Sequence, residues 1–112
     1  MKRILIFWVT LLKMCGMDDT VLHIAARNNS LNDALVFLQN RALIDLKGDL
    51  GNTPLHYACM FGNIEMVRLL LDNGSDKNRQ NEFGEDAVRI AINSSSENKE
   101  KIVKLLNNFK KR

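Results

Sequence analysis

The stretch "TPLHYACMFGN", residues 53–63, decides the fold because most of its first half occurs twice. "TVLHIA" at residues 20–25 lies 33 residues before "TPLHYA" at 53–58. At the same offset Gly51 falls on Gly84, and "SLNDALVFL" (30–38) falls on "NIEMVRLLL" (63–71). Self-similarity at a fixed period of this length indicates stacked repeats that bury a continuous core together.

Each copy has the layout of two short helices. Thr53 can cap the first helix, and Pro54 suits its first position, where no backbone N–H is needed. Asn63 is expected to cap a second helix with a wide apolar stripe, which Gly74 can close in the left-handed conformation. A third copy follows, in which "KIVKLL" (101–106) is displaced by three further residues, and "NSSSEN" (93–98) is the natural place for that insertion.

These residues resemble the ankyrin repeat in order and spacing, most strongly from Gly51 through the T-P-L-H segment to Asn78. The resemblance implies an all-α solenoid of about three stacked helix-turn-helix repeats, at about 18–47, 48–80 and 81–112, with the terminal repeats acting as caps. It also implies structural roles for a set of motif residues, in which each threonine and histidine brace the start of a helix: Thr20, His23, Thr53, Pro54, His56, Gly62 and Gly74.

The outer copies depart from the family pattern. In the first copy Val21 replaces the proline and Arg41 stands where the closing glycine belongs. In the third copy Asp86 replaces the capping threonine, Arg89 replaces the histidine and Lys110 replaces the last glycine. Such departures suit terminal repeats, because one face of each must tolerate water.

Residues 1–17 form an apolar leader that lies outside the repeats. The nine-residue run "ILIFWVTLL" is bracketed by basic residues and is too short to span a bilayer, which needs about 20 apolar residues. We expect a helix that caps the first repeat or a mis-assigned start. A secretory signal is the alternative, although the segment "LKMCGMDD" lacks the small residues of a cleavage site.

The distribution of charge argues against nucleic acid as a partner. Residues 1–17 carry three basic and no acidic residues, and residues 97–112 carry six basic and two acidic residues. The middle, residues 18–96, has seven basic and eleven acidic residues, a net charge of −4. Phosphate binding requires positive charge on the folded face, whereas here it lies in the ends.

The sequence contains no motif that predicts catalysis, a cofactor or a metal. His56 and Cys59 are three residues apart, but zinc needs four converging ligands, so we expect the histidine to brace the helix start and Cys59 to be a small buried residue. The acidic pairs Asp18–Asp19 and Glu85–Asp86 stand where helices begin, and there they favour the helix dipole. We therefore expect that the chain is not an enzyme.

The positions that the repeat pattern leaves free are the candidate contacts for a partner protein, on the turns and on the inner helices. Large apolar groups there invite burial by another chain, and Tyr57, Leu50 and Phe83 stand out. Met60 and Phe61 are expected to pack on the adjacent repeat instead. The predicted contact residues are Lys47, Asp49, Leu50, Tyr57, Arg79, Gln80, Glu82 and Phe83.

The sequence therefore predicts a non-catalytic interaction module that binds another protein to inhibit, tether or chaperone it. Two cysteines make no disulfide framework, so we expect a reducing compartment, the cytoplasm or alternatively the nucleus. We also expect the protein to be a monomer. The alternatives are a secreted or membrane-associated effector, if the leader is a signal, and a metal protein or enzyme centred on His56.

Overall fold

The structure, a computed structural model, describes residues 19–39 and 44–109. Within these ranges the chain forms six α-helices in three successive pairs and no strand. The pairs are α2 (Val21–Asn28) with α3 (Leu31–Phe37), α4 (Pro54–Met60) with α5 (Ile64–Asp72), and α6 (Ala87–Asn93) with α7 (Lys99–Asn108). A 3₁₀ turn, η2 (Asp49–Gly51), lies in the first long loop.

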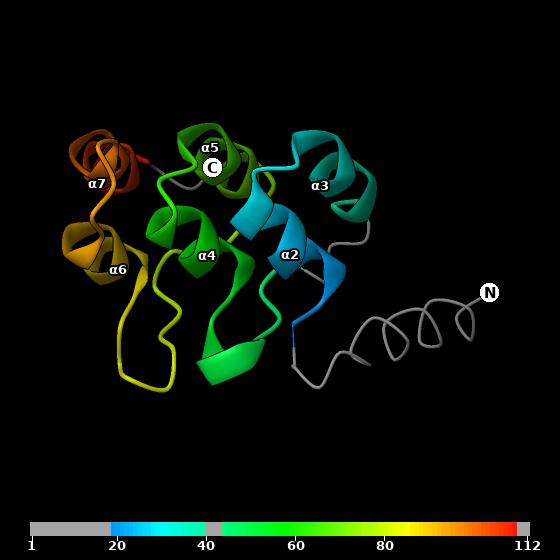
Figure 1. Ribbon diagram of the computed structural model, residues 1–112, viewed down its shortest axis with the longest axis horizontal. Coiled ribbons are helices and arrows are strands. Elements are labelled where there is room, and N and C mark those ends of the chain that lie inside the picture. The colour runs from blue at the N-terminus through cyan, green and yellow to red at the C-terminus, as the bar shows by residue number, and fades with distance from the viewer. Residues whose placement is uncertain (1–18, 40–43, 110–112) are drawn as a thin grey trace.

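The helix pairs stack side by side in two rows (Figure 1). The inner row holds α2, α4 and α6, with α4 packed between the other two, and the outer row holds α3, α5 and α7. The long loops that join successive pairs project beyond the inner row. The predicted all-helical solenoid is confirmed.

The apolar stripes of both rows meet in one core. A helix this short cannot form alone in water, so burial against neighbouring repeats must stabilise it. The largest buried apolar side chains come from all three pairs: Leu22, Leu55, Met66, Val67, Leu70, Leu71, Ile102 and Leu106. Burial of each contributes about 1.5–3 kcal/mol relative to exposure.

The helix starts show one departure from the sequence prediction. Asp86 caps α6 by accepting a hydrogen bond from the Arg89 N–H at 2.9 Å. Asn63 stands at the start of α5, but its side chain makes no cap bond there. Its Nδ2 donates instead to the carbonyl of Ala26 at 2.8 Å, at the end of the preceding inner helix. Asn63 therefore occupies the predicted N-cap position of α5, but its side chain joins two repeats instead of capping the helix.

Two turns require glycine for different reasons. Gly62 has a φ of 70°, and a Cβ on it would stand 1.8 Å from Ser96 Oγ, within the inserted segment of the third repeat. Gly74, which ends the second outer helix, has a φ of 96° with open space around it. At Gly62 both conformation and space exclude a side chain, whereas at Gly74 only conformation does.

The predicted leader, residues 1–17, lies outside the described residues, as do Arg41 and Lys110. Among the helices within 19–39 and 44–109, none has the length and apolar character that crossing a bilayer requires.

Candidate functional site: the loop tips and the bracing motifs

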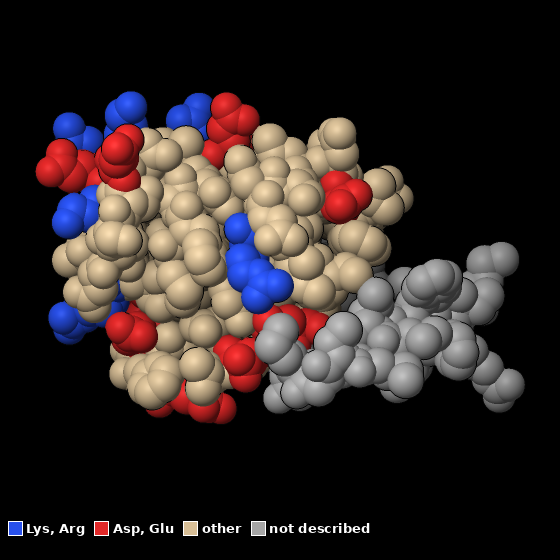
Figure 2. All heavy atoms as spheres, viewed as in Figure 1, with Lys and Arg blue, Asp and Glu red and all other residues tan. Residues whose placement is uncertain are grey.

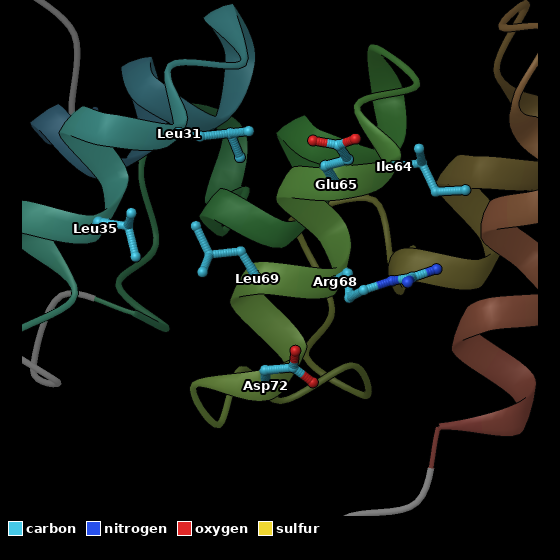
Figure 3. A pocket seen from close by; sticks show the side chains of 7 residues that line it. All are labelled: Leu31, Leu35, Ile64, Glu65, Arg68, Leu69 and Asp72. Atoms are coloured by element: carbon cyan, nitrogen blue, oxygen red, sulfur yellow. The ribbon is translucent and has the colours of Figure 1, made fainter.

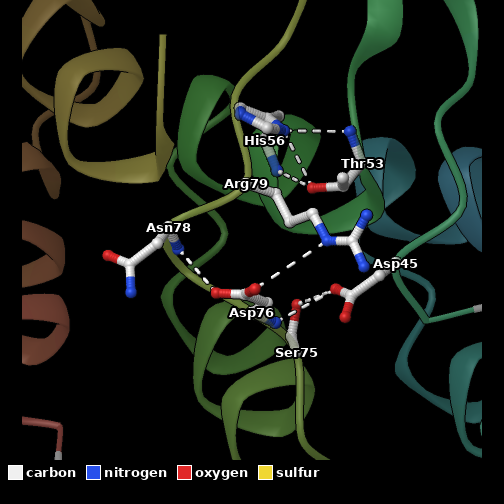
Figure 4. Close-up of polar contacts among 7 residues, drawn as sticks. All are labelled: Asp45, Thr53, His56, Ser75, Asp76, Asn78 and Arg79. Carbon is white, nitrogen blue, oxygen red and sulfur yellow. Dashed lines mark hydrogen bonds and ion pairs between the residues drawn. The ribbon is translucent and has the colours of Figure 1, made fainter.

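The Thr–His pairs fix the start of each of the first two inner helices. The Thr53 N–H donates to His56 Nδ1 at 2.9 Å, and the Thr53 hydroxyl lies 2.8 Å from the same nitrogen (Figure 4). In return, Thr53 Oγ1 accepts the His56 backbone N–H at 3.4 Å. Thr20 and His23 make the equivalent bonds to Nδ1, at 3.0 and 2.8 Å.

The far side of each ring joins neighbouring parts of the stack. His56 Nε2 lies 2.9 Å from the Glu85 carbonyl, so this nitrogen carries the proton and donates. His23 Nε2 lies 2.7 Å from the Leu46 carbonyl and 3.0 Å from the Asn52 carbonyl. Each ring therefore links the start of a helix to loop backbone that is more than 20 residues away in sequence. Burial lowers the pKa of His56 from its ordinary value, which favours the neutral ring that this network needs.

The structure gives Cys59 and His56 packing roles. Cys59 is buried, and burial, with a smaller effect of the Asp86 charge, raises the pKa of its thiol. A buried thiol of this kind is inert rather than nucleophilic. Within the part of the chain that the structure describes, no group of three or more histidine, cysteine, aspartate or glutamate side chains is arranged to hold a metal ion.

The two long loops lie against each other, and we call residues 48–52 and 81–85 the loop tips. The Glu82 N–H donates to the Leu50 carbonyl at 3.0 Å, and Asn81 Nδ2 donates to Asn52 Oδ1 at 3.0 Å. At the loop bases, Asp45 Oδ1 accepts the Asp76 N–H at 3.0 Å (Figure 4). The tips therefore form one continuous edge along the stack instead of separate mobile turns.

Most of the predicted contact residues lie on this edge or beside it. Leu50 and Phe83 are exposed to 48% and 67% of their surface, and Glu82 is exposed as well. Asp49 is half-buried because its N–H donates to Asp19 Oδ1 at 2.8 Å. The remaining predicted contacts that are exposed stand nearer the loop bases: Lys47, Arg79 and Gln80. Figure 2 shows acidic side chains gathered on this side of the molecule, over the ends of the loops.

Tyr57 is the exception, and its assignment as a surface contact is corrected here. Only 7% of its surface is exposed, and its ring packs edge-on against His23 with centroids 5.8 Å apart. Its hydroxyl donates to both carboxylate oxygens of Asp19 at 3.0 Å. Burial, and then the bond to Asp19, raise the pKa of Tyr57 to about 12. The residue joins the first two repeats and is not available to a partner.

Asp19 is a structural residue whose role the sequence analysis did not find. Its carboxylate is buried and accepts bonds from the Tyr57 hydroxyl and the Asp49 N–H. The repeat pattern could have predicted that Tyr57 is buried, because the equivalent positions in the other two repeats are the apolar residues Ile24 and Ile90. The partner carboxylate, 38 residues away, leaves no such periodic trace.

Two further residues differ from their prediction. Met60 and Phe61, at the end of α4, are exposed instead of packed on the adjacent repeat. They present further apolar surface that is open to a partner, at the end of α4.

A family model described as ankyrin repeats, in three copies, matches residues 5–81 and 22–111. The predicted resemblance is thereby confirmed. Ankyrin repeats are in general non-catalytic modules that bind other proteins.

Several curated proteins share this segment at the level of sequence. The chain is 38% identical over 73 residues to palmitoyltransferase ZDHHC13 of Homo sapiens, covering 64% of the chain and 12% of that protein. It is 31% identical over 78 residues to a transient receptor potential cation channel subfamily A member 1 homolog of Caenorhabditis elegans, covering 69% of the chain and 6% of that protein. Palmitoyltransferase ZDHHC17 of Rattus norvegicus is 41% identical over 58 residues, which cover 51% of the chain and 9% of the relative. The chain thus corresponds to a small part of each relative, and the match with the three-copy model shows that it belongs to the ankyrin-repeat family.

Proposed function

We propose that the chain binds another protein through the loop tips and through Met60 and Phe61 at the exposed end of α4. It thereby inhibits, tethers or chaperones that protein without catalysis. The observation that carries the proposal is the pair of large apolar side chains on neighbouring tips, Leu50 and Phe83. They stand at equivalent positions of successive repeats, 33 residues apart. The hydrogen bond from Glu82 to Leu50 holds the two tips side by side.

Leu50 combines a strained backbone conformation with an exposed apolar side chain. Its φ of 57° lies in the left-handed region, which costs a non-glycine residue about 1–2 kcal/mol, and about half of its side chain faces water. Residues held in such conformations cluster at binding sites, where the strain serves function. A partner that buries Leu50 together with Phe83 would recover the hydrophobic contribution that the free protein lacks.

The acidic character of the tips sets the polarity of the partner. Residues 48–52 and 81–85 contain Asp49, Glu82 and Glu85 and no basic residue. Complementary charge speeds association and disfavours wrong partners more than it adds affinity. The proposed partner surface is therefore apolar at its centre and basic at its rim.

Two buried side-chain types support the proposals on cellular location and on the lack of catalysis. Cys59 is buried as a free thiol, in keeping with the reducing environment of the cytoplasm, where we propose that the protein acts as a monomer. Its histidines are used in bracing bonds, in keeping with a non-catalytic role.

The test is quantitative affinity capture from native lysate with the full chain and a double variant, Leu50→Asn with Phe83→Ser. Asparagine tolerates the left-handed conformation, so the variant removes the apolar groups without adding strain. The matched control is Ile92→Ser, which removes an exposed apolar side chain from α6. We expect partners that the wild type and Ile92→Ser retain and that the double variant loses. Equal capture by all three proteins would show that the loop tips are not the binding surface.

A further inference from the structure

The outer row has a second apolar surface on a different side of the molecule from the loop tips. Three positions on the outer helices, exposed or half-buried, can be compared across the repeats because they recur at fixed offsets in α3, α5 and α7. The residues in chain order are Leu31, Leu35 and Val36 on α3, Ile64, Arg68 and Leu69 on α5, and Glu100, Lys104 and Leu105 on α7. The third repeat is charged at two of these positions, whereas the first repeat is apolar at all three.

This difference is not explained by the core of the first repeat. Ala34 is the only fully buried residue within α3, and 52% of the Leu35 surface is exposed. In the second and third repeats the equivalent positions carry the charged residues Arg68 and Lys104, as expected for a surface in water. Contact with water therefore does not explain a leucine at position 35, whereas a role in binding another molecule does.

The exposed Leu35 and the half-buried Leu31, Ile64 and Leu69 line a groove between α3 and α5 with a volume of about 490 Å³. Figure 3 shows Leu31 and Leu35 pointing from α3 toward Leu69 of α5. Glu65 and Asp72 stand on α5 toward the two ends of the groove, while Arg68 points to the side of α7. The floor is thus apolar. Among the charged side chains that line the groove on α5, the carboxylates of Glu65 and Asp72 outnumber Arg68.

We propose that this groove binds an amphipathic helix of a partner protein, with an apolar stripe against Leu31, Leu35 and Leu69 and basic residues beside Glu65 and Asp72. Charge complementarity favours a basic partner, since two carboxylates face one arginine on α5 and α3 contains no lysine or arginine. An apolar helix face laid into a groove is an established mode of recognition, read through anchors at positions i, i+3, i+4 and i+7.

The spacing along α5 fits such a helix. Glu65 and Asp72 are seven residues apart, and a rise of 1.5 Å per residue separates them by about 10.5 Å along the axis. Two basic residues at i and i+7 of a parallel or antiparallel helix have the same separation. Leucine anchors between them then face Leu35 and Leu69. This surface and this partner are independent of the loop tips.

The test uses the full chain and a synthetic helical peptide of about 15 residues, near the length at which isolated helices become stable. The peptide carries lysines at i and i+7, to match the separation of Glu65 and Asp72, and leucines at i+3 and i+4 between them. One control peptide has the same composition in scrambled order, and another has glutamate in place of lysine. Affinity is measured by fluorescence anisotropy, and the bound surface is mapped by amide chemical shifts. We expect binding of the basic peptide alone, with shifts confined to α3 and α5.

Variants of the protein test the assignment to the groove. Leu35→Arg installs the side-chain type that α5 carries at the equivalent position, and we expect it to weaken binding at least about tenfold, as for a buried anchor. Glu65→Gln with Asp72→Asn should weaken binding mainly at low salt, because screening already removes part of the attraction at high salt. Lys104→Ala, the matched control on α7, should leave affinity within about twofold, as surface substitutions away from a contact do.

Several outcomes would overturn the proposal. Equal binding by wild type and Leu35→Arg, with folding verified by circular dichroism, would exclude the groove. Loss of binding in Phe83→Ser alone would place the peptide on the loop tips, which would refute this inference and leave the proposed function intact. A dimer in light scattering that Leu35→Arg dissociates would show that a second copy of the chain occupies the groove.

Discussion

The second and third repeats begin their inner helices with different chemistry at equivalent positions. Thr53 and His56 form a closed set of bonds, and the ring continues to the Glu85 carbonyl in the next loop. Asp86 and Arg89 replace them in the third repeat, where the carboxylate accepts only the backbone N–H of its own helix. The Arg89 side chain is exposed, whereas His56 is buried.

This difference separates two functions that the T-P-L-H segment combines. Starting a helix requires an acceptor at the cap, and threonine and aspartate both supply one. Joining repeats requires a side-chain donor that reaches the loop backbone of the next repeat, and here Nε2 of His56 supplies it. The histidine is therefore a bond between repeats as much as a part of the helix start.

The largest expected effect comes from removing that bond. His56→Ala leaves the buried Thr53 N–H without its partner, and an unsatisfied buried group costs about 1–3 kcal/mol. It also removes one of the two hydrogen bonds to the Glu85 carbonyl, which then accepts only the Asn81 N–H. We expect the free energy of unfolding to fall by about 3 kcal/mol in urea denaturation. Arg89→Ala, at the equivalent position, should change it by less than about 0.5 kcal/mol because the side chain is exposed.

Equal losses in the two variants would mean that the inter-repeat bond contributes nothing beyond helix initiation. An intermediate result can be resolved with Thr53→Asp, which keeps a cap acceptor but removes the hydroxyl that faces His56 Nδ1. A loss in Thr53→Asp close to that in His56→Ala would show that the closed set of bonds acts as a unit.

The same comparison has a pH dependence, which we expect to be smaller. Because burial lowers the pKa of His56 below its unfolded value of about 6.5, the unfolded chain binds the proton more tightly. The contribution of His56 is therefore fully present above that pH and is lost as the pH falls toward the lower folded-state pKa. The stability gap between wild type and His56→Ala should narrow between about pH 7.5 and pH 5.5, whereas the gap for Arg89→Ala should not.

A constant gap for His56→Ala across this range would contradict the lowered pKa. Denaturation curves at several pH values, with salt held fixed, provide the measurement. His23 is present in both proteins, so its titration cancels in the difference.

The repeat period predicted the features that recur in each copy. The six helices, the two Thr–His pairs and the left-handed Gly74 follow from residue types at fixed offsets. Such features depend on local conformation and on the common packing of one repeat on the next. The sequence period predicts these features well because each repeat forms the same local structure.

The features that the sequence did not predict are contacts made once. Asp19 meets Tyr57, and Asn63 reaches the carbonyl of Ala26, through pairings that no second copy repeats in the same residues. The groove beside Leu35 was missed for a related reason. The groove exists because of the distance between the outer helices α3 and α5, and the apolar pattern of one helix does not predict the distance to its neighbour.

The loop tips provide the smallest expected effect and extend the comparison beyond the helices. Leu50 and Phe83 occupy equivalent positions, but of the two only Leu50 has a positive φ, at 57°. Leu50→Asn should raise the free energy of unfolding by about 1 kcal/mol, because asparagine accepts this conformation at lower cost. Phe83→Asn relieves no such strain and should stay within about 0.5 kcal/mol of wild type. Parallel urea denaturation of the two variants gives the difference directly. If Leu50→Asn is no more stable than Phe83→Asn, then the backbone at Leu50 holds no strain, and the argument that function maintains a leucine there loses its energetic basis.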